Sequence, residues 1–244
     1  MKMVIWAAMK TQMSLFPSSA RKRSGAAVQA GGRSDCYYDQ WRPEVAALVP
    51  PRCRRVLEVG CGAGEMGRLL VRRGHHVTGI ELVPEMAERA RRRLDRVLTA
   101  DVEQDGFPFP PASFDALIFA DVLEHLVDPW RVLREAVEVL ADDGVVVASI
   151  PNVQNIDVLR RLLLGRWEYR ERGIMDIGHL RFFTLSSIRA LFAQANLTVA
   201  QVGHRYRRSW WRELLCWLTA GRARALWTRQ YLVVGRPIPS RRRD

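Results

Sequence analysis

The chain has 244 residues, 48% of them hydrophobic, which is enough to bury the core of one α/β domain with appendages. Its net charge is +12, but residues 1–34 contribute +6 and residues 205–244 contribute +9, so the body between them is slightly acidic. No apolar run can span a bilayer, and the four cysteines form no CxxC pair, which argues against a membrane-spanning protein, a disulfide framework and a metal site.

Residues 1–34 contain six basic residues and no acidic one, and we expect a disordered basic tail there. Residues 35–244 are expected to form one domain. Reduced thiols and the absence of a signal-peptide pattern predict a cytoplasmic protein.

Apolar strand-like runs alternate with amphipathic helical patterns along this domain, which predicts a doubly wound α/β fold with a mostly parallel sheet. Strands are expected over residues 55–60, 76–81, 97–100, 114–120 and 145–150, and later over 197–203 and 230–235. Helices are expected over residues 64–73, 84–94, 129–140 and 186–195, with Pro84 and Pro129 at first-turn positions.

The first predicted strand leads into a loop with glycine at every second position, Gly60, Gly62 and Gly64. A glycine-rich turn between a buried strand and a helix lets the backbone approach a ligand closely, which is typical of nucleotide-type sites. The strand also carries one acid, Glu58, among its apolar residues.

Two further acids end the next two predicted strands. Glu81 follows Gly64 by 17 positions, and its two oxygens can accept hydrogen bonds from both hydroxyls of a ribose. Asp101 can accept from an adenine amino group, with Leu82 and Val102 as apolar walls for the ring. A strand-end acid can equally be a helix cap or a solvated residue.

Together these features resemble the class I S-adenosylmethionine-dependent methyltransferases, over roughly residues 37–204 and the final strand. The resemblance rests on residues 58–64, Glu81, the pair Ala100-Asp101, and residues 114–125, which look like the fourth-strand motif of the ubiquinone-biosynthesis-type subgroup. Residues 150–152 and 178–184 resemble a subset associated with cell-envelope glycan and other secondary O-methylations. The resemblance implies a Rossmann-like seven-stranded sheet whose last strand is antiparallel.

The resemblance also implies roles for these residues. Gly60, Gly62 and Gly64 would contact the methionine part of S-adenosyl-L-methionine, Glu81 the ribose, Asp101 the adenine and Glu58 the amino end, and Asp121 would border the methyl group. Methyl transfer needs positioning and exclusion of water, and an alcohol acceptor also needs a base. His179 and His125 are the candidates, although each is also readable as a structural histidine.

Other functions remain as alternatives. Residues 62–67 formally satisfy the dinucleotide fingerprint GxGxxG, but Gly60 and Cys61 separate that triplet from the strand, which disfavours a dehydrogenase. The basic ends allow an RNA methyltransferase, although the acidic body and the lack of an RNA-binding module make nucleic acid an unlikely partner. A non-catalytic methyltransferase-like binding module is the third alternative.

Residues 205–228 are predicted to be an insertion before the last strand, rich in arginine and tryptophan. Within it, residues 206–227 place Trp210, Trp211 and Trp217 on one helical side. Such a helix suits peripheral contact with an anionic membrane at its inner face, or a lid packed on the domain. We therefore expect a small-molecule or lipid/glycan-linked acceptor, methylated on oxygen.

Overall fold

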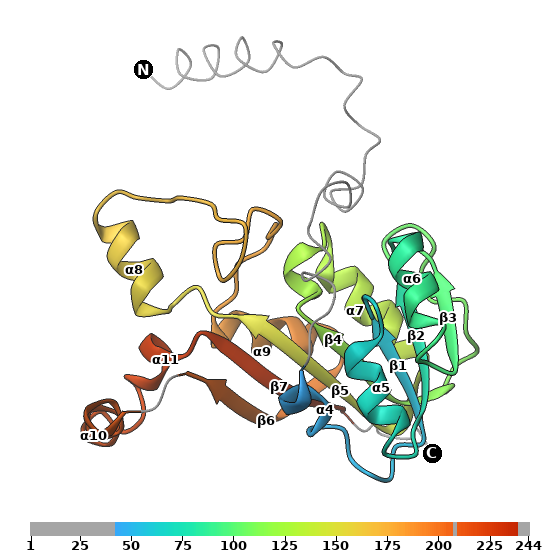
Figure 1. Ribbon diagram of the computed structural model, residues 1–244. Helices are drawn as coiled ribbons and strands as arrows, with labels where there is room; N and C mark the ends of the chain where they lie inside the picture. The colour runs from blue at the N-terminus through green and yellow to red at the C-terminus, as the bar shows by residue number, and fades with distance from the viewer. Residues whose placement is uncertain (1–41, 207–208, 239–244) are drawn as a thin grey trace, which may run out of the picture.

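The computed structural model in Figure 1 describes residues 42–206 and 209–238. The predicted basic tail, residues 1–34, lies outside the described residues.

A seven-stranded sheet with the order β3-β2-β1-β4-β5-β7-β6 forms the centre of the fold. The strands are β1 (Arg55–Val59), β2 (His76–Glu81), β3 (Arg96–Thr99), β4 (Phe114–Ala120), β5 (Leu140–Pro151), β6 (Leu197–Arg205) and β7 (Gln230–Pro237). The first five strands pair in parallel, whereas β7 runs antiparallel to both β5 and β6. The predicted fold class, including the antiparallel last strand, is confirmed.

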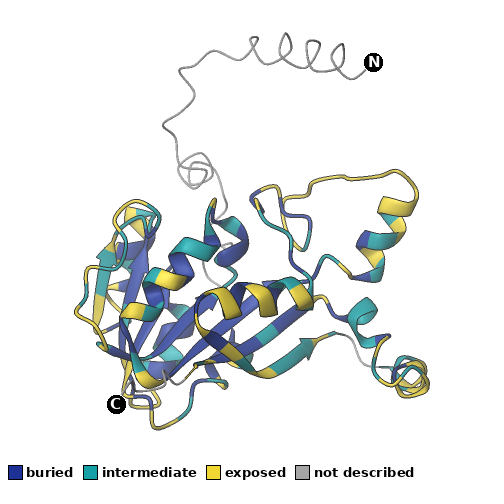
Figure 2. Cartoon of the chain, turned by 180° about the vertical axis from the view of Figure 1, so that it is seen from behind, coloured by how far each residue is buried: buried dark blue, intermediate teal, exposed yellow. Residues whose placement is uncertain are grey.

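Successive strand residues point to opposite sides of the sheet, and the side chains on both faces are buried. On β4, Ala116 and Ile118 belong to the core under α4 (Pro43–Ala46), α5 (Glu65–Val71) and the end of α6 (Pro84–Ala90), while Leu117 and Phe119 belong to the core under α7 (Pro129–Glu138) and α9 (Leu185–Gln194). The opposite views in Figures 1 and 2 show α5 before one face and α9 before the other. Because β1 to β5 pair in parallel, their carboxyl ends lie along one edge of the sheet.

The predicted helix starts at Pro84 and Pro129 are confirmed, and local chemistry explains the second. The Asp128 side chain accepts a hydrogen bond from the Arg131 amide, so it caps α7 immediately before Pro129. α6 ends four residues earlier than expected, because residues 91–94 form turns instead of continuing the helix.

β5 is longer than the predicted strand over residues 145–150. It begins at Leu140, which pairs with Phe114, and the register then jumps so that Ala116 pairs with Val145. The residues between bulge out of the ladder. A Cβ on Gly144 would come within 2.5 Å of Leu140 Cδ1, so this bulge needs glycine.

Three helices lie beyond the β5-β7-β6 end of the sheet: α8 (Ile156–Leu163), α10 (Trp210–Leu218) and α11 (Arg224–Trp227). The sequence did not predict α8. α10 is the helix expected in the arginine- and tryptophan-rich insertion, and Figure 2 shows it largely exposed or intermediate in burial. Among the described helices, none is long and apolar enough to cross a membrane.

Candidate functional site

The glycine loop follows β1 directly and has left-handed backbone at all three predicted glycines, with φ of 67° at Gly60, 54° at Gly62 and 82° at Gly64. The amides of Gly60 and Cys61 both donate to the Ile80 carbonyl, at 2.8 and 3.1 Å. A Cβ on Gly60 would lie 2.7 Å from Val122 Cγ2, so the loop packs closely against the chain that leaves β4.

The far side of this loop is held by Arg93, which follows α6. Its guanidinium donates to the Ala63 carbonyl at 2.7 Å and forms an ion pair with Glu65 at 2.8 Å. The loop is therefore fixed from both sides before any ligand binds, which reduces the ordering cost of binding.

Glu81 ends β2 beside the loop and is nearly buried. One carboxylate oxygen accepts from the Gly62 amide at 2.8 Å, and the other accepts from the Val83 amide at 2.9 Å. Burial raises the pKa of Glu81, and the backbone donors at Val83, Gly62 and Leu82 oppose this. Because a carboxylate offers about four acceptor positions, acceptor capacity remains beside the backbone donors, so the residue fits the expected methyl donor.

Asp101 lies in the turn after β3, where its carboxylate accepts from the Glu103 amide and the Gln104 side chain, each at 2.9 Å. Of the two predicted ring walls, Leu82 is partly exposed and Val102 is buried in the core. The carboxylate keeps acceptor positions for an adenine amino group, and this role remains a prediction.

Glu58 lies inside the fold, with its carboxyl group against Gly67 of α5. Burial, with a smaller contribution from Glu81, raises the pKa of Glu58 to about 8, and the nearby Gly67 amide only partly opposes this. Its Oε2 has no partner within hydrogen-bond geometry among the described residues. Contact with the amino end of the cofactor remains a prediction for this residue.

The raised pKa of Glu58 predicts a pH-dependent stability in the protein without ligand. Between its usual value near 4.5 and about 8, the folded state holds a proton that the unfolded state has released. The free energy of unfolding therefore falls as pH rises through this window. Glu58→Gln is expected to reduce the drop in melting temperature between pH 5 and pH 8, and an equal drop in both proteins would contradict the assignment.

Asp121 follows β4 with a positive φ of 56° and joins several elements. The buried Arg42 guanidinium forms an ion pair with it, the Gln230 amide donates to it, and the Ser149 hydroxyl donates at 3.2 Å. Arg42 also donates to Ser149, at 3.0 Å. Burial raises the pKa of Asp121, and the charge of Arg42 opposes this. Asp121 thus fastens β4, β5, β7 and the start of α4 together.

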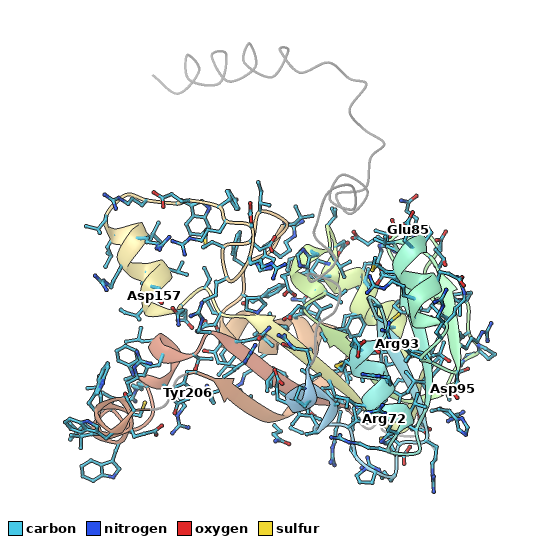
Figure 3. All side chains as sticks on the ribbon, viewed as in Figure 1. Arg72, Glu85, Arg93, Asp95, Asp157 and Tyr206 are labelled. Atoms are coloured by element: carbon cyan, nitrogen blue, oxygen red, sulfur yellow. The ribbon has the colours of Figure 1, made fainter. Side chains whose placement is uncertain are left out.

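A cavity of about 610 Å³ opens next to Asp121. Its lining combines acids and histidines with four arginines: Arg42, Asp121, Glu124, His125, Pro151, Arg172, Gly173, Ile174, Asp176, His179, Arg205, Tyr206, Arg229 and Gln230. Figure 3 shows Tyr206 at the β6 end of the sheet, on the side of Asp157, while Arg93 and Asp95 lie at the opposite end. Of the predicted cofactor residues, Asp121 lines the cavity, whereas Glu58, the three glycines, Glu81, Leu82, Asp101 and Val102 do not.

His125 and His179, the two predicted bases, both line this cavity. The fold brings their segments together, because Gly178, the residue before His179, is 53 positions from His125. The His125 Nδ1 lies 2.8 Å from the Gly178 carbonyl, and the His179 Nδ1 lies 2.9 Å from the Ile174 carbonyl. Their rings pack edge to face with centroids 4.8 Å apart. Both histidines line the same cavity as Asp121, and their role as bases remains a prediction.

Sequence reasoning missed Glu124, which lies between two predicted residues. It is 1% exposed, neither carboxylate oxygen has a hydrogen bond within the described part of the chain, and Oε1 lies 4.0 Å from His179 Nε2. Burial and the charge of Asp121 raise its pKa well above the usual range. The sequence signal for Glu124 was its position between the apolar residues Leu123 and Leu126.

The segment that carries His179 is held by its backbone to the turn η2 (Leu123–His125), which follows β4. The amides of Leu180 and Arg181 donate to the Glu124 carbonyl, at 2.8 and 3.0 Å. Asn152, which follows β5, donates to the carbonyls of Ala225 and Thr228, at 2.8 and 2.9 Å. These hydrogen bonds thus join segments that are far apart in the sequence.

The chain is similar in sequence to known methyltransferases. The sequence model of the methyltransferase domain matches residues 33–202, more than half of the chain. The ubiquinone biosynthesis O-methyltransferase of Xylella fastidiosa (strain 9a5c) is 34% identical over 113 residues, covering 44% of this chain and 46% of that protein. The 27-O-demethylrifamycin SV methyltransferase of Amycolatopsis mediterranei (strain S699) is 35% identical over 108 residues, covering 41% and 40%. The chain spans less than half the length of these relatives.

Solved structures support the fold. A SAM-dependent methyltransferase from Archaeoglobus fulgidus superposes with a TM-score of 0.62 at 15% identity, covering 83% of this chain and 94% of that one. The 1,6-didemethyltoxoflavin-N1-methyltransferase of Burkholderia thailandensis gives a TM-score of 0.54 at 19% identity, covering 81% and 78%.

Proposed function

The chain belongs to the methyltransferase-domain family, the class I S-adenosylmethionine-dependent methyltransferases, and on that basis we propose that it methylates an oxygen of a small or lipid/glycan-linked acceptor. S-adenosyl-L-methionine supplies the methyl group when bound. In the proposed donor site the glycine loop holds the methionine part, Glu81 the ribose and Asp101 the adenine. The spare acceptor positions of Glu81 support this placement.

The observation that carries the proposal is the position of residues 121–125 between donor loop and cavity. Val122 packs against Gly60 of the loop, while Asp121 and His125 line the cavity. A methyl group held over the loop would therefore meet an acceptor held in the cavity, away from bulk water. Because methyl transfer is an in-line displacement, such positioning supplies much of the catalysis.

The histidines support oxygen as the methylated atom. A carbonyl oxygen can only accept, so Nδ1 of His125 and of His179 carries the ring proton in the neutral form. Nε2 is then the basic atom of each ring, and it suits removal of a hydroxyl proton. One partly covered relative is named a ubiquinone biosynthesis O-methyltransferase and another a 27-O-demethylrifamycin SV methyltransferase, which agrees with this choice.

The arginines support an acceptor that carries negative charge, such as the phosphate of a lipid- or glycan-linked molecule. Arg205 and Arg229 line the cavity and are exposed, on the β6 and β7 side of the sheet. Guanidinium groups bind phosphate through two parallel hydrogen bonds.

The apolar surface of α10 supports access to such an acceptor at a membrane. Trp210 and Trp217 are 80% and 77% exposed, and Arg212 stacks on Trp211 and Trp227 at 5.0 Å from each ring centroid. Exposed tryptophans flanked by arginine suit an anionic headgroup layer. Trp210→Ala with Trp217→Ala should reduce co-sedimentation with anionic vesicles. Equal pelleting would instead favour a lid or a soluble acceptor.

Methyl transfer to a panel of acceptors tests the function directly. We expect labelled methyl from S-adenosyl-L-methionine to appear on hydroxyl-bearing, anionic small molecules or lipid-linked glycans, and His179→Ala to lower turnover at least tenfold with cofactor affinity unchanged. Transfer to RNA alone would establish the nucleic-acid alternative. Cofactor binding without transfer to any acceptor would favour a non-catalytic module. Full turnover by the His179→Ala variant would exclude His179 as the base.

A further inference from the structure

Five polar side chains form a closed ring beside the cavity: Asp121, Arg42, Glu44, Arg205 and Gln230. Arg42 forms an ion pair with Asp121, and its Nε lies 3.6 Å from Glu44 Oε1. The Nε of Arg205 lies 3.8 Å from the same Glu44 oxygen. On the other side of the ring, Arg205 Nη1 donates to Gln230 Oε1 at 3.1 Å, and Gln230 Nε2 donates to Asp121. Two routes therefore join Arg205 to Asp121.

The members of this ring differ in their access to the cavity. Arg205 ends β6 and pairs across the ladder with Gln230, the first residue of β7. Arg42 and Gln230 are each only 8% exposed, whereas 55% of the Arg205 side chain is exposed. Arg205 lines the cavity together with the exposed Arg229. A charged group that enters the cavity can therefore meet Arg205, while Asp121 lies deeper.

The charges of the ring balance, since two carboxylates face two guanidinium groups. Burial raises the pKa of Asp121, and the charges of Arg42 and Arg205 oppose this. The charge of Arg205 thus acts at Asp121, and a change in that charge alters the potential there. Glu44 Oε1 and Arg42 Nε make no hydrogen bond to any described residue, so the contacts of Glu44 in the ring are ionic and can shift.

An anion held by Arg205 and Arg229 would disturb this balance. It neutralises Arg205 and competes with Glu44 for the guanidinium group. Glu44 then pairs with Arg42 alone, so less of the Arg42 charge compensates Asp121. Both effects make the potential at Asp121 more negative. S-adenosyl-L-methionine carries a positive sulfonium, whereas S-adenosylhomocysteine carries a neutral sulfur, so only the methylated donor gains from this change.

We propose that Arg205 is a positioning residue that couples the two substrates: an anionic group of the acceptor, bound at Arg205, raises the affinity for S-adenosyl-L-methionine and leaves that for S-adenosylhomocysteine unchanged. The coupling rests on the proposed function, because it needs the donor beside Asp121 and an anionic acceptor in the cavity. By linkage, the methylated donor favours acceptor binding to the same extent. Transfer of the methyl group removes the sulfonium charge, so the spent donor loses this advantage.

The test is calorimetric titration of the full chain with each of the two ligands, in inorganic phosphate and in chloride at equal ionic strength. Phosphate is the probe for the acceptor's anionic group. We expect phosphate to tighten binding of S-adenosyl-L-methionine about fivefold, the lower end of usual coupling because Arg205 is partly exposed to solvent, and to leave S-adenosylhomocysteine unchanged. Arg205→Gln removes the charge permanently, so this variant should bind S-adenosyl-L-methionine about fivefold more tightly without phosphate and gain nothing from it. A merely structural role of Arg205 would instead weaken both ligands.

Arg236→Gln is the matched control, because Arg236 is an exposed arginine near the other end of β7, about 20 Å along the strand from Gln230 and beyond the screening length. It should respond to phosphate like the wild type. Wild-type affinity for S-adenosyl-L-methionine that is equal in both buffers would overturn the coupling. The same holds if phosphate tightens both ligands equally, or if Arg205→Gln binds S-adenosyl-L-methionine no more tightly than the wild type. A wild type that binds neither ligand would contradict the proposed function itself, so the two failures are distinguishable.

Discussion

Asp121→Ala is expected to lower the free energy of unfolding by about 3 kcal/mol, the lower end of the cost of breaking a buried ion pair. The substitution leaves the buried Arg42 guanidinium without its main counter-charge, although Glu44 remains 3.6 Å from Arg42 Nε. Gln230 and Ser149 lose an acceptor at the same time. Chemical denaturation followed by circular dichroism measures the change.

Two variants control this prediction. Glu88→Ala removes an exposed acid that pairs with Arg91 and should cost no more than about 1 kcal/mol. Arg42→Met removes the charge that Asp121 balances, so Asp121→Ala should cost clearly less in that background. If Asp121→Ala cost as little as Glu88→Ala, Asp121 would not join the elements as described.

Glu81→Ala is expected to weaken binding of S-adenosylhomocysteine at least 100-fold. It removes the acceptors proposed for both ribose hydroxyls and also releases the Gly62 and Val83 amides that the carboxylate holds. Hydrogen bonds to a charged group contribute about 1.5–3 kcal/mol each, which makes a loss of this size reasonable. Isothermal titration calorimetry measures it.

Asp101→Ala provides the comparison. It should weaken binding about tenfold, because a single hydrogen bond to adenine is lost and the turn it caps is partly exposed. Unchanged affinity in both variants would refute the roles given to these two acids.

Much of the sheet was predictable because its signals are local. The apolar runs of β1, β2 and β4 and the capped start of α7 at Asp128 specify their own structure. β5 was predicted too short because its first residues bulge out of the ladder around Gly144, which depends on pairing with β4 and not on the strand itself. α8 was missed although its apolar and charged residues recur with a helical period; among its residues only Val158 is buried.

Candidate site residues could be predicted where they lie together in one recognisable sequence segment. Asp121 and His125 lie in one motif after β4, and His179 lies in a second recognisable segment. Arg42 was not predictable, because its partner Asp121 is 79 positions away and only the folded sheet brings them together. Glu124 was overlooked because a buried acid next to apolar residues resembles a solvated one until its surroundings are known.

The most direct test of the central claim, that the glycine loop and Glu81 form an S-adenosylmethionine site, is the melting temperature of the protein with S-adenosylhomocysteine and, separately, with NAD. Only a ligand that prefers the folded state stabilises it. We predict a saturable rise with S-adenosylhomocysteine that Glu81→Ala abolishes, and no rise with NAD. A rise with NAD alone would contradict the account.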